Sequence, residues 1–471
     1  MSGILSAITA FTNWVWGIPM LVFLVGGGVF LTVRLGFLQF RKLPFILKNT
    51  IGKSFGKKGE NGRFSGWQAV TGALASTLGA GNIVGTAMAI AFGGPGGVFW
   101  MWVTGLVACA IKYSEVTMAM RHRHLDKHGK WDGGPQYYLT EATGWKWISP
   151  TYAIVVIIGL FLAASAQIGA GVDNIVTLGA PRFPTIVVMT LLCGVVVVGG
   201  MKSLLTVTEK MVPVMSVLYI TGALLVIILN IQNLPSAFFS IFRYAFTGHA
   251  AVGGFVGAGT AACIRWGVAR GIYSNDSGTG ITTISHSVAE ANHPSQQGMW
   301  GVFEVFFSSM IACTMSCLVI LCTGVWQAEG ADSSTMTAAA FESTLGSAGG
   351  TLVTIAIFLF VFTTACAQIE FACAQLGRLV GDLGRKYGRW VMLVMIFIGG
   401  LVGIEALIGY VDFVNFFIVF FNMIVIYSHN GEIVESTKEY FSDTKRWETE
   451  KWSKWVAMEA EYEISKQSIK K

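Results

Sequence analysis

The sequence predicts an all-α polytopic membrane protein, and three observations carry this prediction. Of its 471 residues, 53% are hydrophobic and only 12% are charged, whereas an average soluble domain has about 25% charged residues. Apolar runs long enough to cross a bilayer recur along the whole chain. Lys and Arg gather in short loops between these runs, where they report membrane topology. This composition excludes an ordinary soluble protein, and a net charge of +6 over this length does not indicate nucleic-acid binding.

A transmembrane helix needs about 20 apolar residues, and about eleven segments of the chain meet this requirement. They cover residues 14–36, 66–93, 95–118, 148–170, 184–200, 208–230, 261–291 (interrupted), 298–325, 350–376, 390–408 and 411–428. The loop 38–65 contains seven basic residues and one acid, whereas the loop 326–347 contains no Lys or Arg. Because basic residues are enriched in cytoplasmic loops, we expect the amino terminus outside and the carboxyl terminus in the cytoplasm.

This pattern predicts a single transmembrane domain over residues 1–428, followed by a cytoplasmic amphipathic tail over residues 429–471. The tail carries Trp447, Trp452, Trp455 and Met458 at near-helical spacing. Such spacing fits either a helix that lies at the membrane interface or a solvated helix that packs on the loops. Eight cysteines lie in apolar stretches without any C-x-x-C pair, so we expect small lipid- or helix-facing residues and neither disulfides nor a zinc site.

Two of the apolar segments contain residues that disfavour a helix at bilayer depth. In the second segment, the run Ala75–Gly85 contains three glycines and Asn82, and in the seventh, the run Tyr273–Gly280 contains glycines and Asp276. Irregular backbone inside a membrane is tolerated only where protein or a water-filled cavity covers it. The free N–H and C=O groups of such broken helices bind carboxylates and small cations in transporters. The alternative is that the glycines only allow close helix packing.

Three motifs resemble those of the alanine/glycine:cation symporter family. They are the stretch Gly94–Trp102, the Gly133-Gly134-Pro135 element followed by Tyr137-Tyr138, and the stretch Arg270–Gly280. The match runs in order from about residue 14 to residue 430. The resemblance implies a LeuT-like fold of two inverted five-helix repeats, near residues 66–230 and 261–428, preceded by one extra helix. The odd spacing of the two interrupted segments independently favours such inverted repeats.

The resemblance also implies sodium-coupled symport of a neutral amino acid by alternating access. The substrate would belong to the alanine or glycine class. A larger or more polar amino acid is the alternative. Sodium would be the coupling ion, and no other cofactor is expected. The partners would be the amino acid, sodium and the lipid bilayer, without nucleic acid. We expect a monomer that spans the plasma (inner) membrane several times and is not an enzyme.

The residues of the site follow from the same resemblance. Substrate is expected at Thr77, Gly79, Gly81, Gln167, Tyr273, Ser274, Asn275, Thr364 and Gln368. Sodium is expected at Ala75, Leu78, Asn82, Thr363 and Thr364. Without the resemblance, the two threonine hydroxyls would equally well bond back to the preceding turn of their own helix.

The ninth segment departs from the family. Gln368 takes a position where relatives usually carry tryptophan, one turn from Thr364 and on the same face. An amide in place of an indole predicts a pocket that accepts a larger or more polar side chain.

Several charged residues at bilayer depth need partners. Glu370 is expected to pair with a base elsewhere in the bundle or to contact substrate or a proton. Glu304 is expected to neutralise a nearby cation. Arg265 and Arg270 have Asp276 and Glu290 as possible partners.

A second hypothesis is a membrane-embedded, metal-dependent enzyme that uses the loop histidines His122, His124 and His128. Neighbouring basic residues oppose metal binding there, so a solvated loop is the alternative interpretation. No phosphate-binding loop, dinucleotide fingerprint or nucleophile elbow occurs in the sequence. An ion gradient is therefore the expected source of energy.

Overall fold

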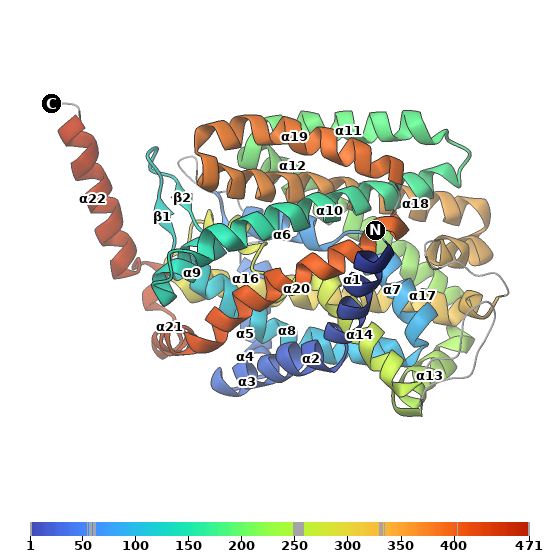
Figure 1. The fold of residues 1–471 in the computed structure, drawn as a ribbon. Coiled ribbons are helices and arrows are strands. Elements are labelled where there is room, and N and C mark those ends of the chain that lie inside the picture. The colour runs from blue at the N-terminus through green and yellow to red at the C-terminus, as the bar shows by residue number, and fades with distance from the viewer. Residues whose placement is uncertain are drawn as a thin grey trace.

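The computed structural model describes residues 2–53, 55, 59, 63–247, 259–328, 333, 335–402 and 404–469. The predicted loops 38–65 and 326–347 and the tenth predicted segment each include residues outside this set. The described chain is almost entirely helical (Figure 1), and its one paired sheet is the hairpin of β1 (His124–Leu125) and β2 (Trp131–Asp132).

The helices in the first third of the chain are α1 (Ser2–Val15), α2 (Ile18–Met20), α3 (Gly27–Arg34), α4 (Leu38–Arg41), α5 (Leu43–Leu47), α6 (Gly66–Thr77), α7 (Ala80–Gly93) and α8 (Gly96–Arg121), with the π-helical turns η1 (Leu21–Gly26) and η2 (Lys48–Gly52). The middle contains α9 (Pro135–Thr143), α10 (Ile148–Val176), α11 (Arg182–Val198), α12 (Gly200–Leu229), the short η3 (Ile231–Asn233), α13 (Leu234–Thr247), α14 (Thr260–Asn275) and α15 (Thr283–Ser287). The last third contains α16 (Pro294–Val305), η4 (Phe306–Cys313), α17 (Thr314–Thr323), η5 (Val325–Gln327), α18 (Met336–Val380), α19 (Asp382–Val402), α20 (Ile404–Ser428), α21 (Asn430–Ser442), η6 (Arg446–Glu448) and α22 (Ser453–Ile469).

Among the described residues, seven helical segments are long and apolar enough to cross a membrane. They are Ser6–Arg34, Gly96–Arg121, Ile148–Val176, Gly200–Leu229, Pro294–Thr323, Met336–Val380 and Gly409–Ser428. The bent pair α6 and α7 would add an eighth span, and α11 is a shorter apolar helix. Besides the bent pair in segment 66–93, three predicted segments do not meet this criterion, namely 184–200, 261–291 and 390–408. The count of eleven stays a prediction.

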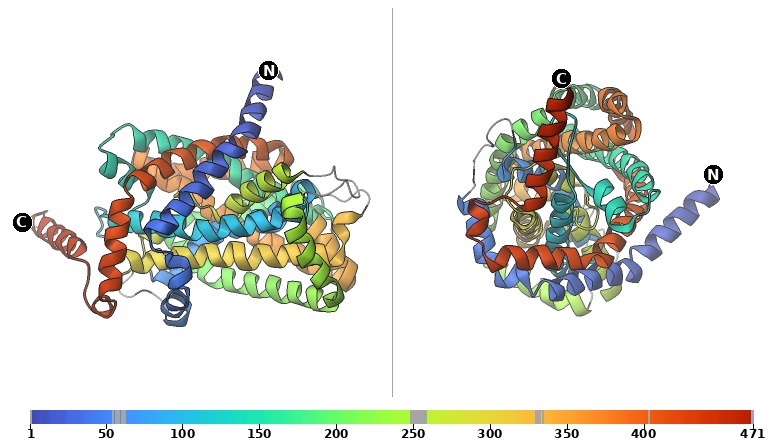
Figure 2. Two further views of the ribbon diagram at one scale, coloured as in Figure 1. Left: turned by 90° about the horizontal axis from the view of Figure 1, so that it is seen from below. Right: turned by 90° about the vertical axis from the view of Figure 1, so that its left-hand side faces the viewer.

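The helices form one elongated bundle in which segments distant in sequence pack side by side. In the bundle, α10 packs against α18, α19 and α20, while α8 packs against α14 and α16 (Figures 1 and 2). Helix α22 and the β1–β2 hairpin lie at one end of the bundle, and α13 lies at the opposite end (Figure 1). This arrangement is the one expected if the hairpin loop and the tail share one side of the membrane.

The start of α6 illustrates how the sequence determines helix boundaries. Ser65 caps this helix, because its hydroxyl accepts a hydrogen bond from the Gln68 N–H at 3.2 Å. The Gln68 side chain in turn accepts from the Ser65 N–H at 3.1 Å, which completes a capping box. A second boundary lies inside α18, where Gly346 takes a positive φ of 67° and kinks the helix. The range of α18 therefore covers two helices that meet at Gly346, and the second of them contains the predicted segment 350–376.

The tail packs on the loops. Trp447, Trp452 and Trp455 are all buried, with at most 7% of their surface exposed. The Trp452 N–H donates to the Asn292 carbonyl at 2.8 Å, and the guanidinium of Arg123 lies over the Trp455 ring at 3.8 Å. The structure therefore favours the second interpretation of the tail, because these rings are covered by protein and do not form a membrane-facing surface. All eight cysteines are free and buried, as small helix-facing residues would be.

We predict that Trp455→Ala releases the tail from the loops. Loss of a fully buried indole costs about 3–5 kcal/mol, which should speed tryptic cleavage of residues 443–469 at least about tenfold if cleavage follows local opening. Val456→Ala is the matched control, because the Val456 side chain is half exposed. Equal cleavage rates for the two variants would contradict this packing.

Candidate functional site

The second predicted segment is broken between α6 and α7. The two helices meet at an angle of 41°, with Leu78 and Gly79 between them. The Gly79 N–H donates to the Asn82 side-chain oxygen at 3.2 Å, and the Ala80 N–H donates to the Gln167 side-chain oxygen at 2.9 Å. Two amide side chains thus satisfy backbone donors at the start of α7. The predicted interruption of this segment is confirmed.

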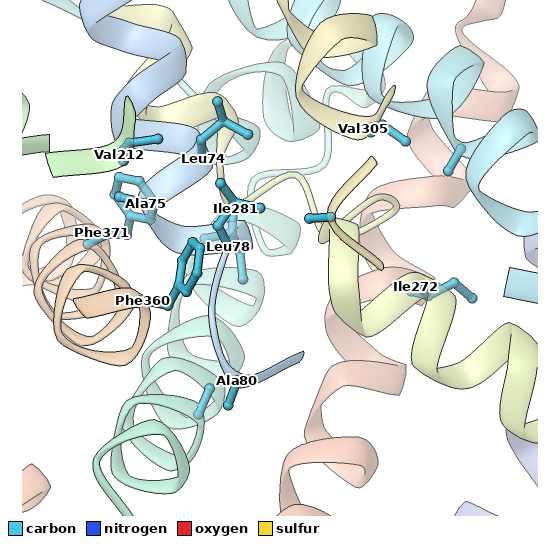
Figure 3. Close-up of a cluster of buried hydrophobic side chains, with 14 of the residues drawn as sticks. Leu74, Ala75, Leu78, Ala80, Val212, Ile272, Ile281, Val305, Phe360 and Phe371 are labelled. Atoms are coloured by element: carbon cyan, nitrogen blue, oxygen red, sulfur yellow. The ribbon is translucent and has the colours of Figure 1, made fainter. Parts of the chain in front are cut away.

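Glycine is required at this break by the close approach of other helices. A Cβ atom on Gly79 would lie 2.7 Å from the Thr364 hydroxyl of α18, and one on Gly81 would lie 2.9 Å from the Tyr273 ring of α14. On the α18 side, Ala75 lies beside Phe371 and Leu78 lies beside Phe360 (Figure 3). The break is therefore tightly packed against α14 and α18.

The seventh predicted segment is also interrupted, as the sequence predicted. Helix α14 ends at Asn275, and Asp276 follows with a positive φ of 55°, so the chain leaves the helix at this carboxylate. Helix α15 resumes at Thr283. The Asn82 amide nitrogen donates to the Ser274 carbonyl at 3.2 Å and to the Ser308 carbonyl at 3.3 Å. Asn82 therefore joins the two breaks directly.

A small cavity of about 30 Å³ lies between the breaks. This volume holds about two water molecules and is too small for an amino acid. Its lining residues are Ser76, Thr77, Gly81, Gly159, Leu160, Ala163, Gln167, Tyr273, Asp276, Ile281, Gln368 and Asn415. A substrate could enter this place only after the surrounding helices move, which is the behaviour expected of a closed conformation.

Five of the nine predicted substrate residues line this cavity, namely Thr77, Gly81, Gln167, Tyr273 and Gln368. Gly79 and Thr364 lie next to it, across the break. The structure does not bring the other two side chains there. The Ser274 hydroxyl donates to the Gly271 carbonyl at 2.7 Å, and the Asn275 amide donates to the Ser309 hydroxyl at 2.9 Å.

Three polar residues of the cavity were not predicted as contacts with substrate: Ser76, Asp276 and Asn415. The Ser76 hydroxyl and the Gln368 side-chain oxygen are buried without a hydrogen-bond partner among the described residues. Polar side chains at bilayer depth mark functional sites by default. That rule would have pointed to Asn415 and also to Lys112, an ammonium within the third predicted segment.

The predicted sodium residues divide into two groups. The Thr364 hydroxyl lies 2.7 Å from the Ala75 carbonyl and 3.2 Å from the Leu78 carbonyl. It also lies 2.8 Å from the carbonyl of Phe360. One hydroxyl proton cannot serve three acceptors, so these oxygens retain the capacity to bind a small cation.

The other two predicted sodium ligands, Thr363 and Asn82, are engaged in other contacts. The Thr363 hydroxyl bonds back to the Phe360 carbonyl at 3.0 Å and faces Met215, so the structure does not bring it to the Ala75 and Leu78 carbonyls. The oxygen of Asn82 accepts from Gly79, as described above.

The buried charged residues pair with residues that differ in part from the predicted partners. Arg270 pairs with Asp412 at 2.6 Å, so neither Asp276 nor Glu290 is its partner, and that prediction is wrong. The physical reason is that α20 presents the Asp412 carboxylate directly to the Arg270 guanidinium. Glu370 pairs with Arg389 at 3.4 Å, as the structural alternative predicted.

Two further predictions concern Arg265 and Glu304. Arg265 donates to the Asn13 side chain at 2.5 Å rather than to either predicted acid. Glu304 lies 3.7 Å from the Lys112 ammonium, which is the cation that it neutralises.

Two of the three loop histidines, His122 and His124, pair with carboxylates, whereas the backbone N–H of His128 donates to the Asp126 side chain at 2.8 Å. His122 bonds to Glu141 at 2.8 Å and to Glu432 at 2.9 Å, and His124 also bonds to Glu141. Burial opposes ionisation of Glu141, but hydrogen bonds from the two histidines lower the pKa of this carboxyl to about 2. Within the described part of the chain, no group of three or more candidate ligands could hold a metal ion. His122 therefore connects the loop to α21, and both His122 and His124 connect it to α9.

Residues 1–454 match the family model described as the sodium:alanine symporter family. The chain belongs to this family. It is 37% identical over 446 residues to the uncharacterized transporter YflA of Bacillus subtilis (strain 168), and the match covers 94% of each chain. It is 32% identical over 450 residues to the sodium/alanine symporter AgcS of Methanococcus maripaludis, covering 92% of this chain and 97% of AgcS.

A solved structure supports the fold. The crystal structure of MhsT in complex with L-phenylalanine matches with a TM-score of 0.55 at 14% identity, covering 86% of this chain and 96% of MhsT. This member of the sodium:alanine symporter family is thus an all-α, multi-pass membrane protein with a LeuT-like fold. It is a transporter and not an enzyme, and the family supports sodium-coupled amino-acid symport as its class of activity.

Proposed function

We propose that the protein carries a neutral amino acid of the alanine or glycine class together with sodium by alternating access, with room for a larger or more polar side chain. The observation that carries this proposal is the meeting of two broken helices at Asn82, beside a cavity and a cluster of convergent carbonyls. The proposed protein is a monomer in the plasma (inner) membrane, with its amino terminus outside and its carboxyl terminus in the cytoplasm.

The polar groups around the cavity suggest how an amino acid would bind. The N–H groups at the start of α7 carry the positive end of its dipole and suit the substrate carboxylate. Gln167 already accepts from one of them, so the carboxylate would displace this amide. The free oxygens of Gln368 and Ser76, together with the carboxylate of Asp276, would accept from the ammonium group or from a polar substrate side chain.

The cation is proposed at the Ala75 and Leu78 carbonyls and the Thr364 hydroxyl. Carbonyls and hydroxyls are hard oxygen ligands that suit a small, hard cation. Because the carbonyls belong to the first break and the hydroxyl to α18, a bound ion would connect the break to its neighbouring helix.

Uptake by purified protein in liposomes tests the proposal. Radiolabelled alanine, with a competition screen of the twenty amino acids, should accumulate only under an inward sodium gradient. Accumulation that continues unchanged when potassium replaces sodium would contradict sodium coupling. Protein-free liposomes are the control for leakage.

We predict that Thr364→Ala raises the sodium concentration required for half-maximal uptake at least about tenfold, which corresponds to about 1.4 kcal/mol of lost ion binding. The physical reason is that the substitution removes one ligand oxygen from the carbonyl cluster. Thr363→Ala is the matched control on the adjacent residue, because its hydroxyl bonds within its own helix. It should change the sodium requirement by less than about twofold if that contact is only structural. An equal loss in both variants would refute this assignment of the ion site.

We predict that Gln368→Trp narrows the set of accepted amino acids toward alanine and glycine. The indole would fill space in the cavity and remove the free amide oxygen. Amino acids with larger or more polar side chains should then compete at least about tenfold less well relative to alanine, since an unpaired polar group or a steric clash costs more than about 1.4 kcal/mol. An unchanged competition profile would show that Gln368 does not determine specificity.

A further inference from the structure

The second break contains a charged group that the proposed transport mechanism does not use. Lys112 lies in the middle of α8 and is completely buried. Its ammonium donates to the backbone carbonyl of Asp276 at 2.9 Å and to the Thr282 hydroxyl at 2.9 Å. Asp276 directly follows α14 and Thr282 directly precedes α15. The ammonium therefore connects the two sides of the break.

Two carboxylates complete the surroundings of this ammonium. Glu304 of α16 lies 3.7 Å away and Glu115 of α8 lies 3.9 Å away, and both are completely buried. In each case, the oxygen that faces Lys112 has no hydrogen-bond partner among the described residues. The other oxygens are engaged, Glu304 with His286 at 2.9 Å and Glu115 with Asn422 at 2.6 Å. Four oxygens thus surround one ammonium group.

A cation is required at this position for two physical reasons. The carboxyl end of α14 carries the negative end of its helix dipole. Two carboxylates add negative charge in a region that is buried from solvent, where an uncompensated charge is very unfavourable. In transporters with broken helices, backbone carbonyls at such a break commonly coordinate a free ion. Here the nitrogen of Lys112 stands among those oxygens.

We propose that Lys112 is a tethered cation that replaces a free monovalent ion at the second break. The break then keeps its shape in every step of transport without binding sodium there. The oxygens around the nitrogen come from a carbonyl, a hydroxyl and two carboxylates, which are also suitable ligands for sodium. Removing the tethered ammonium should therefore create a new site for a free cation. Lys112 is a positioning residue in this scheme, because it lines no part of the cavity described above.

Lys112→Ala tests the proposal through the stability of the purified protein. Thermal unfolding is followed in choline chloride, sodium chloride and ammonium chloride at equal ionic strength. Replacing choline by sodium or ammonium should raise the unfolding midpoint of this variant by roughly 5 °C more than that of the wild type. Lys210→Ala is the matched control, since Lys210 is exposed on α12. It should behave as the wild type does.

The outcome of this experiment separates a tethered cation from a merely structural lysine. A structural residue would destabilise the protein equally in all three salts, and that result would overturn the proposal. Recovery of Lys112→Ala only from sodium- or ammonium-containing buffers would support it. No amino acid is needed, so failure of the proposed symport activity would not affect this result.

A second variant is needed if Lys112→Ala does not fold. The double variant Lys112→Met/Glu304→Gln removes one positive and one negative charge and leaves the net charge of the cluster unchanged. We expect it to fold, to show no added response to sodium, and to take up radiolabelled alanine at least tenfold more slowly than the wild type. This readout rests on the proposed function. A double variant that folds and transports alanine at the wild-type rate would overturn the proposed role of Lys112.

Discussion

The side chain of Asn82 makes the contacts on which the rest of the site depends. Its oxygen accepts from the Gly79 N–H, while its nitrogen donates to the Ser274 and Ser308 carbonyls. The Gly79 N–H lies at the start of a helix, where it has no intrahelical acceptor, and a buried donor without a partner costs about 1–3 kcal/mol. An amide can donate and accept at once, whereas a carboxylate only accepts and an aliphatic side chain does neither. One residue thereby stabilises both breaks and sets their distance from each other.

The buried charged side chains, like that of Asn82, bond to groups on other parts of the bundle. Lys112 is surrounded by oxygens at the second break, Arg270 pairs with Asp412, and Glu370 pairs with Arg389. Each pair joins different helices, so the penalty of removing a charge from water is offset only when those helices are packed together. These contacts therefore act mainly by determining which helices pack together. Their contribution to the stability of the fold is secondary.

The sequence was sufficient to predict features that depend on local composition. Glycines and Asn82 at bilayer depth predicted the first break, and the one-turn spacing from Thr364 predicted that Gln368 faces the cavity. Features that depend on packing could not be predicted in this way. Ser274 and Asn275 lie in a family motif, yet their side chains contact Gly271 and Ser309 because α14 presents another face to the cavity. The acid that pairs with Arg270 comes from α20, about 140 residues away in sequence, and a single sequence does not show which helices meet.

The position of the cavity explains how one ion could control access to it. Helices α7, α14 and α16 each pack on α8, and α10 packs on α18 and α19. The cluster around Lys112 lies within the first group, whereas the cavity lies between the two groups, with Gly81 and Tyr273 on one side and Gln167 and Gln368 on the other. The carbonyls beside Thr364 also lie at this boundary, because they join the first break to α18.

A cation bound at these carbonyls would favour the conformation in which the two groups of helices are close. A ligand shifts a conformational equilibrium only through such a difference in affinity. Movement of one group against the other would break these ion contacts and open the cavity together, which is the physical requirement for coupling the ion to the substrate.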